Sequence, residues 1–358
     1  MQRIKVLVTG AGAPGIRGTL HTLRQNPDGV PVEIVGTDVK TDVSGRFLVD
    51  RFYQVPPPES EAYIPYLVKI CEKEDITIVL PQTTREVQEL GKARQDLWEK
   101  GIRVGVSSFE AISLANDKYQ LLNVFSRLGL PHPIYRLVRS EEELVLAVEE
   151  LGYPRLPVVV KPPTSNGMRG FRILKEAAWD ADRFLKDKPD GVEISLSELL
   201  AILRRGPRWP VLLVTEYLPG QEYTVDAFCG KKAFVAVPRA RMAIRSGITF
   251  VAKVEPRGDL KKYTREAAQA IGLEYAFGFQ FKLDANGIPK ILECNPRIQG
   301  TMVASVFAGH NIPWYAVREL LEKPVSTEEI REAGLQVAKF YRYWGGVGVI
   351  DGDVVEEI

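Results

Sequence analysis

The sequence predicts an α/β domain with an open parallel sheet over residues 1–112, followed by α+β segments as far as residue 358. Two observations predict this fold. Apolar, β-branched runs alternate with helix-like stretches in the first third of the chain, with strands expected at residues 4–8, 33–37, 76–80 and 103–106. Later strand-like runs are separated only by turn residues, most clearly within residues 277–297. Alternation of strands and helices favours parallel strands with crossover helices, whereas strand-like runs separated only by a turn favour antiparallel hairpins.

Composition excludes several classes of protein. With 358 residues, 45% of them hydrophobic, the chain has room for two or three domains. Its 47 basic and 46 acidic residues are well mixed, which argues against binding to nucleic acid or to an anionic membrane. Cys71, Cys229 and Cys294 are scattered, which argues against disulfides and a zinc site. No leader and no apolar stretch of roughly 18 residues is evident, so a cytoplasmic location is expected.

A glycine-rich turn follows the first expected strand. Gly10, Gly12 and Gly15 satisfy the GxGxxG pattern, and the next strand ends at Asp38, where a dinucleotide-binding fold has an acidic residue for the ribose. The same glycines can serve only to pack a strand against a helix, so the pattern alone leaves both interpretations open.

Two lysines occupy positions that invite a functional explanation. Lys118 lies in the first turn of a helix capped by Asn116 or Asp117, where its charge opposes the helix dipole, although a surface lysine is the alternative. Lys161 ends an apolar strand and precedes the loop 164–170, which contains Ser165 and Gly167. Small residues with available backbone N–H groups can close over phosphates, whereas the alternative is a plain hairpin loop.

A third motif follows the strand expected at residues 211–217. A strand edge at Glu216, Tyr217 and Leu218 can hydrogen-bond adenine through its backbone, and the carboxylate of Glu222 just beyond can hold two ribose hydroxyls. Asp226 is expected to orient neighbouring groups. The segment 175–210 between these motifs is expected to be helical.

Arginines then follow the strand expected at residues 234–238. Arg239 and Arg241 share one face by their spacing of two, which is repulsive unless an anion lies between them. A solvated basic edge is the alternative, and Arg245 is a weaker candidate.

The hairpin within residues 277–297 carries the densest set of oxygen donors. Alternation of phenylalanines on one face turns Gln280 to the other. If Asp284 pairs with residue 289 across a four-residue loop, Gln280 lies opposite Glu293, and Asn295 shares the face of Glu293. Arg297 lies just beyond. Oxygen ligands with a nearby guanidinium suit Mg²⁺ and a phosphate, whereas a merely solvated polar face is the alternative.

This ordered set, Gln280 followed by Glu293-x-Asn295-Pro-Arg297, resembles the metal-binding signature of the ATP-grasp superfamily. The resemblance implies that Glu293 bridges two Mg²⁺ ions (or Mn²⁺), that Gln280 and Asn295 each complete one, and that Arg297 holds the transferring phosphoryl group. Nearly the whole chain is similar to such proteins, especially to the ATP-grasp unit of the carbamoyl phosphate synthetase large subunit. The expected domains are then a Rossmann-like domain at 1–112, a linker helix and small lobe at 113–205, and a carboxyl-terminal lobe at 206–358.

The resemblance also assigns roles to the other motifs. It implies that Lys118, Lys161, Ser165 and Gly167 contact the ATP phosphates, that residues 216–218 contact adenine, and that Glu222 binds the ribose. It implies that Arg239 and Arg241 hold the γ-phosphate and an acceptor carboxylate or acyl phosphate. The glycine loop of the first domain would then be structural or face the substrate. Residues 300–311 and 312–321 are expected to be helices, and residues 336–349 a closing strand pair.

The expected function is therefore an ATP- and Mg²⁺-dependent ligase that joins a small carboxylate to an amine through an acyl phosphate. Two alternatives are an NAD(P)-dependent oxidoreductase built on Gly10, Gly12, Gly15 and Asp38, and an ATP-binding sensor without catalysis. The partners expected are small molecules, with neither nucleic acid nor membrane. A homodimer is the default for the oligomeric state.

Overall fold

The computed structural model describes residues 3–165, 167–176, 180–186, 191–343, 345–350 and 353–357. The chain divides into two compact units. Unit 1 comprises Met1–Ala115, Glu222–Gln280 and Cys294–Ile358, and unit 2 comprises Asn116–Gln221 and Phe281–Glu293. The domain boundaries expected after residues 112 and 205 stay predictions.

The first sheet of unit 1 is parallel, as the alternation of strands and helices predicts, with the order β3-β2-β1-β4-β5. Its strands are β1 (Ile4–Thr9), β2 (Val32–Asp38), β3 (Arg51–Gln54), β4 (Ile78–Leu80) and β5 (Arg103–Val104). The central strands are buried because their residues are almost all apolar, whereas β3 at the edge is exposed or partly buried along its length. The sequence analysis missed β3 because it has no apolar run.

Helices cover this sheet, and two apolar clusters form the cores on its faces. The helices of this part of the chain are α1 (Ile16–Arg24), η1 (Ser44–Phe47), α2 (Tyr63–Glu74), α3 (Thr84–Lys92), α4 (Arg94–Glu99) and α5 (Phe109–Asn116). Helix α3 begins with a capping box in which Thr83 and Glu86 hydrogen-bond each other's backbone N–H groups.

A second, six-stranded sheet has the order β15-β14-β11-β12-β13-β16. Its strands are β11 (Glu222–Cys229), β12 (Phe234–Arg245), β13 (Ile248–Val254), β14 (Tyr275–Leu283), β15 (Pro289–Asn295) and β16 (Lys339–Tyr341). The helices of this part of the chain are α10 (Gly258–Ile271), α11 (Ala304–Phe307), α12 (Ile312–Leu320) and α13 (Thr327–Ala333).

Three expectations about this part are wrong. Strand β12 runs on through Arg245, so Arg239 and Arg241 lie within a strand and pair with β11 or β13. Residues 336–349 do not pair with each other: β16 joins β13, and β17 (Val347–Ile350) pairs with β18 (Asp353–Glu357). Residues 300–311 contain only the short helix α11, because Gly309 with φ +96° and the turn before His310 interrupt it.

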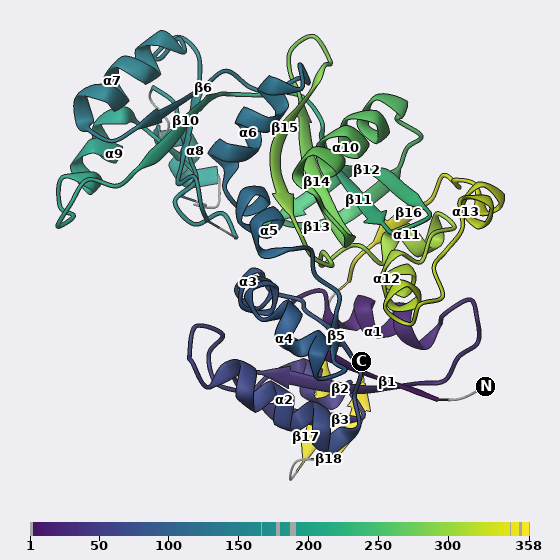
Figure 1. Cartoon of the computed structure of the whole chain (residues 1–358). Helices are drawn as coiled ribbons and strands as arrows, with labels where there is room; N and C mark the ends of the chain where they lie inside the picture. The colour runs from purple at the N-terminus through teal and green to yellow at the C-terminus, as the bar shows by residue number, and fades with distance from the viewer. Residues whose placement is uncertain are drawn as a thin grey trace. The chain divides into compact units, whose positions relative to one another are not determined.

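Unit 2 contains a five-stranded sheet of order β6-β10-β7-β8-β9, with helices α7 and α9 beside strands β6 and β10 in Figure 1. Its strands are β6 (Tyr135–Val138), β7 (Val158–Lys161), β8 (Arg172–Leu174), β9 (Glu193–Ile194) and β10 (Leu212–Glu216). Its helices are α6 (Lys118–Arg127), α7 (Glu141–Glu150), α8 (Ala181–Lys186) and α9 (Leu196–Leu203). The segment expected to be helical from 175 to 210 therefore includes the short strand β9, and its Trp179 lies outside the described residues. Among the described residues, no helix is long and apolar enough to cross a membrane.

Glu86 makes the stability of unit 1 depend on pH. Its carboxylate is almost fully buried, and burial raises its pKa from 4.5 to about 7, although hydrogen bonds from Thr83 oppose the rise. The folded chain therefore binds more protons than the unfolded chain between these two values. The stability that Glu86 contributes is fully present below pH 4.5 and is lost as the pH rises through 7.

We expect this carboxylate to lower the free energy of unfolding by roughly 3 kcal/mol between pH 4.5 and 8. Urea denaturation at pH 5, 6, 7 and 8 measures the effect as the difference between the wild type and Glu86→Gln. Equal pH slopes for the two proteins would contradict the prediction.

Candidate functional site

Lys118 of unit 2 is held at the start of a helix. The Asp117 carboxylate caps α6 by accepting from the N–H groups of Tyr119 and Gln120, at 2.9 and 3.1 Å, which fixes the first turn. Only 6% of Lys118 is exposed. Its Nζ donates to the carbonyl oxygen of Ser165 at 2.8 Å and lies 3.7 Å from Oε2 of Glu293. A buried ammonium with these neighbours is not an ordinary surface lysine.

Lys161 is the second buried lysine of unit 2. It ends β7, and its Nζ donates to the carbonyl oxygen of Leu292 at 3.5 Å, one residue before Glu293. The loop after it contains Gly167 with φ +60°, whereas Asn166 in the same loop lies outside the described residues. Both lysines and Ser165 therefore gather beside the strand that carries Glu293.

The residues predicted to contact adenine lie at the end of β10: Glu216 ends the strand, and Tyr217 and Leu218 follow it. The Glu216 carboxylate accepts from the N–H of Ile134 at 2.9 Å and from Nζ of Lys290 at 2.6 Å, so its side chain is tied into unit 2. Leu218 is buried, and the ammonium of Lys282 lies 5.2 Å from the centroid of the Tyr217 ring. The expected contact of residues 216–218 with adenine stays a prediction.

Arg241 organises a second group of predicted site residues, in unit 1. Its guanidinium donates to Thr249 Oγ1 at 2.8 Å, to the carbonyl oxygen of Gly247 at 2.6 Å and to the Glu222 carboxylate. It also lies 3.3 Å from Oε1 of Gln280. One cation therefore joins the predicted ribose ligand Glu222 to the predicted metal ligand Gln280, and a solvated basic edge is the wrong description of this residue.

Arg239 lies in a different environment from Arg241. It is only 1% exposed, and its Nε and Nη2 donate to the fully buried carboxylate of Asp226 at 2.7 and 3.2 Å. Asp226 thus orients Arg239, as the sequence analysis expected. The Nη1 of Arg239 makes no hydrogen bond with any described residue. A buried guanidinium N–H without a partner indicates an acceptor that the protein itself does not supply.

Arg342 is a functional candidate that the sequence analysis missed. Its Nη1 donates to the carbonyl oxygen of Pro14 at 2.8 Å, and its Nη2 donates to the carbonyl oxygen of Gly300. Its Nε is buried without a partner in the described chain. Burial, and then the charge of Arg239, lower the pKa of Arg342. No local motif marks this arginine, because its neighbours come from distant parts of the sequence.

The third group comprises Asn295 and Arg297, also in unit 1. Arg297 lies 3.5 Å from Oδ1 of Asn295 through Nη2 and 3.4 Å from Oγ1 of Thr84 through Nε. Its Nη1 donates to the carbonyl oxygen of Ile298 at 3.0 Å. These contacts keep the guanidinium beside the predicted metal ligand at the end of β15.

The turn between β14 and β15 is shorter than the four-residue loop that the sequence analysis considered. The N–H of Asp284 donates to the carbonyl oxygen of Ile288 at 2.9 Å, because Gly287 with φ +79° closes the turn one residue early. Simple counting from residue 289 therefore does not set the register of Gln280 and Glu293. The two strands remain neighbours in the sheet order.

The three predicted metal ligands fit Mg²⁺ by their chemistry. Gln280 lies on β14, and Glu293 and Asn295 lie on β15. The described residues contain no group of three or more His, Cys, Asp or Glu suited to a metal ion. The predicted set has one carboxylate and two amides, so it is not a group of that kind. Oxygen donors completed by phosphates and water are what Mg²⁺ accepts. Each donor oxygen also lies 3.3–3.7 Å from a cationic nitrogen, so a metal ion bound there would need anions such as phosphates to balance the positive charge.

The glycine loop after β1 is closed by its own neighbours. The Asp38 carboxylate accepts from the N–H of Gly12 at 2.7 Å. A Cβ on Gly12 would lie 2.7 Å from the Val43 side chain, and a Cβ on Gly15 would lie 2.3 Å from Cα of Gly300. A Cβ on Gly10 would likewise lie 2.7 Å from the Thr83 side chain, so close packing accounts for all three glycines, and the acid expected on a ribose already binds the loop.

Family models match two parts of the chain. Residues 208–342 match the model described as "ATP-grasp in the biosynthetic pathway with Ter operon", and residues 6–105 match "PylC-like, N-terminal domain". The arginine-specific large chain of carbamoyl phosphate synthase from Bacillus subtilis is 26% identical over 280 residues, which are 75% of this chain and 24% of that protein. The chain spans only 20–30% of the length of the curated relatives that it matches.

Solved structures share the fold. N5-carboxyaminoimidazole synthetase from Staphylococcus aureus, in complex with ADP, matches with a TM-score of 0.68 and 15% identity over 93% of this chain and 80% of that chain. The biotin carboxylase domain of Hydrogenobacter thermophilus 2-oxoglutarate carboxylase, with MgADP, ADP and bicarbonate, has a TM-score of 0.67 and 19% identity. This match covers 91% of this chain and 71% of the biotin carboxylase chain.

The solved structures show that this chain shares their fold. The match of residues 208–342 to an ATP-grasp family model, and of residues 6–105 to a PylC-like N-terminal domain, confirms the resemblance to ATP-grasp proteins that the motifs predict.

Proposed function

We propose that this chain is an ATP- and Mg²⁺-dependent ligase that activates a small carboxylate as an acyl phosphate and transfers the acyl group to an amine. A carboxylate oxygen attacks the γ-phosphorus of ATP and ADP leaves. The amine nitrogen then attacks the acyl carbon, phosphate leaves, and the nitrogen loses a proton. Such chemistry depends on positioning and charge neutralisation rather than on a dedicated base.

One observation carries the proposal. Within unit 2, two buried lysines converge on the strand that carries Glu293: Lys118 Nζ lies 3.7 Å from Glu293, and Lys161 Nζ donates to the carbonyl oxygen of Leu292. Burying two ammonium groups together is unfavourable unless anions compensate them. The triphosphate of a nucleotide supplies such anions, and Ser165 and Gly167 belong to the loop that would cover it.

The remaining residues take roles that agree with their contacts. Gln280, Glu293 and Asn295 would hold Mg²⁺, which when bound neutralises the phosphate oxygens on which negative charge develops. Arg297, fixed beside Asn295, would contact the transferring phosphoryl group. Arg241 would link Glu222 at the ribose to Gln280 at the metal, so that its role is to position both ligands.

The acceptor acid would bind between Arg239 and Arg342. Both guanidinium groups belong to unit 1, each has one buried N–H without a described partner, and Asp226 is the carboxylate that pairs with Arg239. Two cations with one carboxylate leave a net positive charge, which the carboxylate of a substrate would balance. This proposal keeps Arg239 at the acceptor acid and gives Arg241, the other arginine expected at the γ-phosphate and the acid, a positioning role.

The two alternatives agree less well with the structure. An oxidoreductase needs its glycine loop open to a pyrophosphate, whereas Gly12 is held by Asp38 and packed against Val43. A sensor without catalysis needs neither the three proposed metal ligands nor the buried guanidinium N–H groups of Arg239 and Arg342 that have no described partner. A homodimer and a cytoplasmic location stay predictions.

Hydroxylamine trapping tests the proposal, because hydroxylamine converts an acyl phosphate to a hydroxamate that ferric chloride detects. The protein is incubated with ATP, Mg²⁺ and each of a panel of acids, including bicarbonate, amino acids and larger carboxylates. We expect at least one acid to give ADP together with inorganic phosphate or a hydroxamate, and EDTA to abolish the reaction. ATP binding without consumption for any acid would instead support the sensor.

A further inference from the structure

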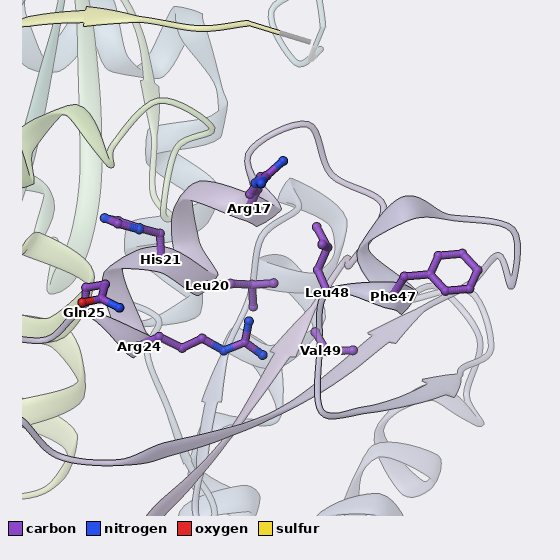
Figure 2. Close-up of a pocket in the computed structure, with 8 residues that line it drawn as sticks. All are labelled: Arg17, Leu20, His21, Arg24, Gln25, Phe47, Leu48 and Val49. Atoms are coloured by element: carbon purple, nitrogen blue, oxygen red, sulfur yellow. The ribbon is translucent and has the colours of Figure 1, made fainter. Parts of the chain in front are cut away.

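We propose that unit 1 carries a second small-molecule site, formed by α1 and the segment after η1, that binds an organic anion with an apolar body. A cavity of about 340 Å³ lies here, within the range of sites for small ligands. Leu20 and Arg24 of α1 point toward Leu48 and Val49 across it, with Arg17 at its upper end (Figure 2). These side chains belong neither to the ATP-grasp motifs nor to the predicted metal ligands.

The floor of the cavity is apolar. Leu20 is only 2% exposed and belongs to the main core cluster of unit 1, and Leu48 and Val49 are half-buried against the same cluster. A ligand resting on this floor would remove apolar surface from water, which is favourable in proportion to the area covered.

The rim of the cavity is positive. Helix α1 contains Arg17, His21 and Arg24 and no acidic residue. Arg17 and Arg24 are seven residues apart, which puts them on the same face of a helix. Asp50 lies 3.6 Å from Arg24, but both side chains are about 40% exposed, so this ion pair is weak and an incoming anion can compete with it. A carboxylate, sulfonate or phosphate between the arginines would complement the rim.

The helix that lines this site packs against the segment that follows Arg297. The first turn of α1 is in close contact with that segment: a Cβ on Gly15 would lie 2.3 Å from Gly300, and a Cβ on Gly18 would lie 3.0 Å from Val303. Near its end, the carbonyl oxygen of Thr22 accepts from Nδ2 of Asn311 at 2.8 Å. A helix packed this closely transmits a shift rather than absorbing it.

Fluorescence titration with 1-anilinonaphthalene-8-sulfonate tests the site, because this probe combines an aromatic body with one anionic group. We expect saturable binding to the full-length chain that persists in excess Mg-ATP. The double variant Arg17→Gln/Arg24→Gln should weaken binding by about tenfold or more, because two charge-assisted contacts are lost. Val49→Phe, which fills the cavity without changing charge, should weaken binding as well.

The matched control is Arg3→Gln/Arg85→Gln, which removes two exposed arginines of the same unit, each in a surface ion pair. It should leave the dissociation constant of the probe unchanged. The proposal is overturned if the control and the cavity variant bind alike, if Val49→Phe has no effect, or if ATP displaces the probe. None of these readouts depends on ligase activity.

Discussion

Replacing Glu293 by Gln should lower ATP turnover by about 100-fold to 1,000-fold, because the only carboxylate among the three proposed metal ligands becomes neutral. Lys118, whose Nζ lies 3.7 Å from Oε2 of Glu293, then also loses the negative charge of this neighbour. Steady-state ADP release, measured with the acid found by hydroxylamine trapping, gives the size of the effect. Raising the Mg²⁺ concentration should restore part of the lost rate if the metal is what Glu293 holds.

The matched control for this prediction is Glu149→Gln, which removes an exposed carboxylate of α7 in the same unit. It should leave turnover unchanged. Thermal unfolding of both variants shows whether they remain folded. If folded Glu293→Gln keeps more than half of the wild-type turnover, Glu293 does not bind the catalytic metal.

Replacing Asp226 by Ala should destabilise the chain by about 3–5 kcal/mol, because it leaves the Arg239 guanidinium buried without its carboxylate. Both side chains of this pair are almost fully buried, so water cannot replace the lost partner. The free energy of unfolding from urea titrations, compared with the wild type under the same buffer, measures the loss.

The double variant Asp226→Leu/Arg239→Met separates the burial of an unpaired charge from the loss of packing. It removes both charges and keeps similar volume, so we expect it to recover most of the stability lost by Asp226→Ala. A single variant within 1 kcal/mol of the wild type would show that the Asp226–Arg239 pair does not hold β11 against β12. Loss of activity in the stable double variant would support a role for Arg239 in binding the substrate acid.

Local signals in the sequence were enough to predict the elements that carry most of the site. Asp117 before Lys118 is a helix-capping residue followed by a helical run, and the structure begins α6 at Lys118. The apolar run that ends at Lys161 forms β7, and the turn residues after Asp284 form the hairpin. In these cases the physical cause lies within a few residues of the feature, so reading along the chain can find it.

Features that depend on distant partners could not be predicted in the same way. Strand β3 pairs with the edge that β2 offers, and its own four residues form too short a run to mark a strand in the sequence. The closing segment joins β13 rather than pairing with itself, for the same reason. Arg342 is the clearest case: its contacts with Pro14 and Gly300 span 328 and 42 residues of sequence, so no local pattern points to it.

We infer that the chain binds ATP through Lys118 and Lys161 and the divalent metal through Glu293. Isothermal titration calorimetry can measure both, with ATP in the presence of Mg²⁺, ATP with EDTA, and NADH as three titrations of the same protein. We expect saturable ATP binding that is tighter with Mg²⁺ and is weakened by Lys161→Ala. Absence of heat with ATP, together with NADH binding that survives Lys161→Ala, would contradict it.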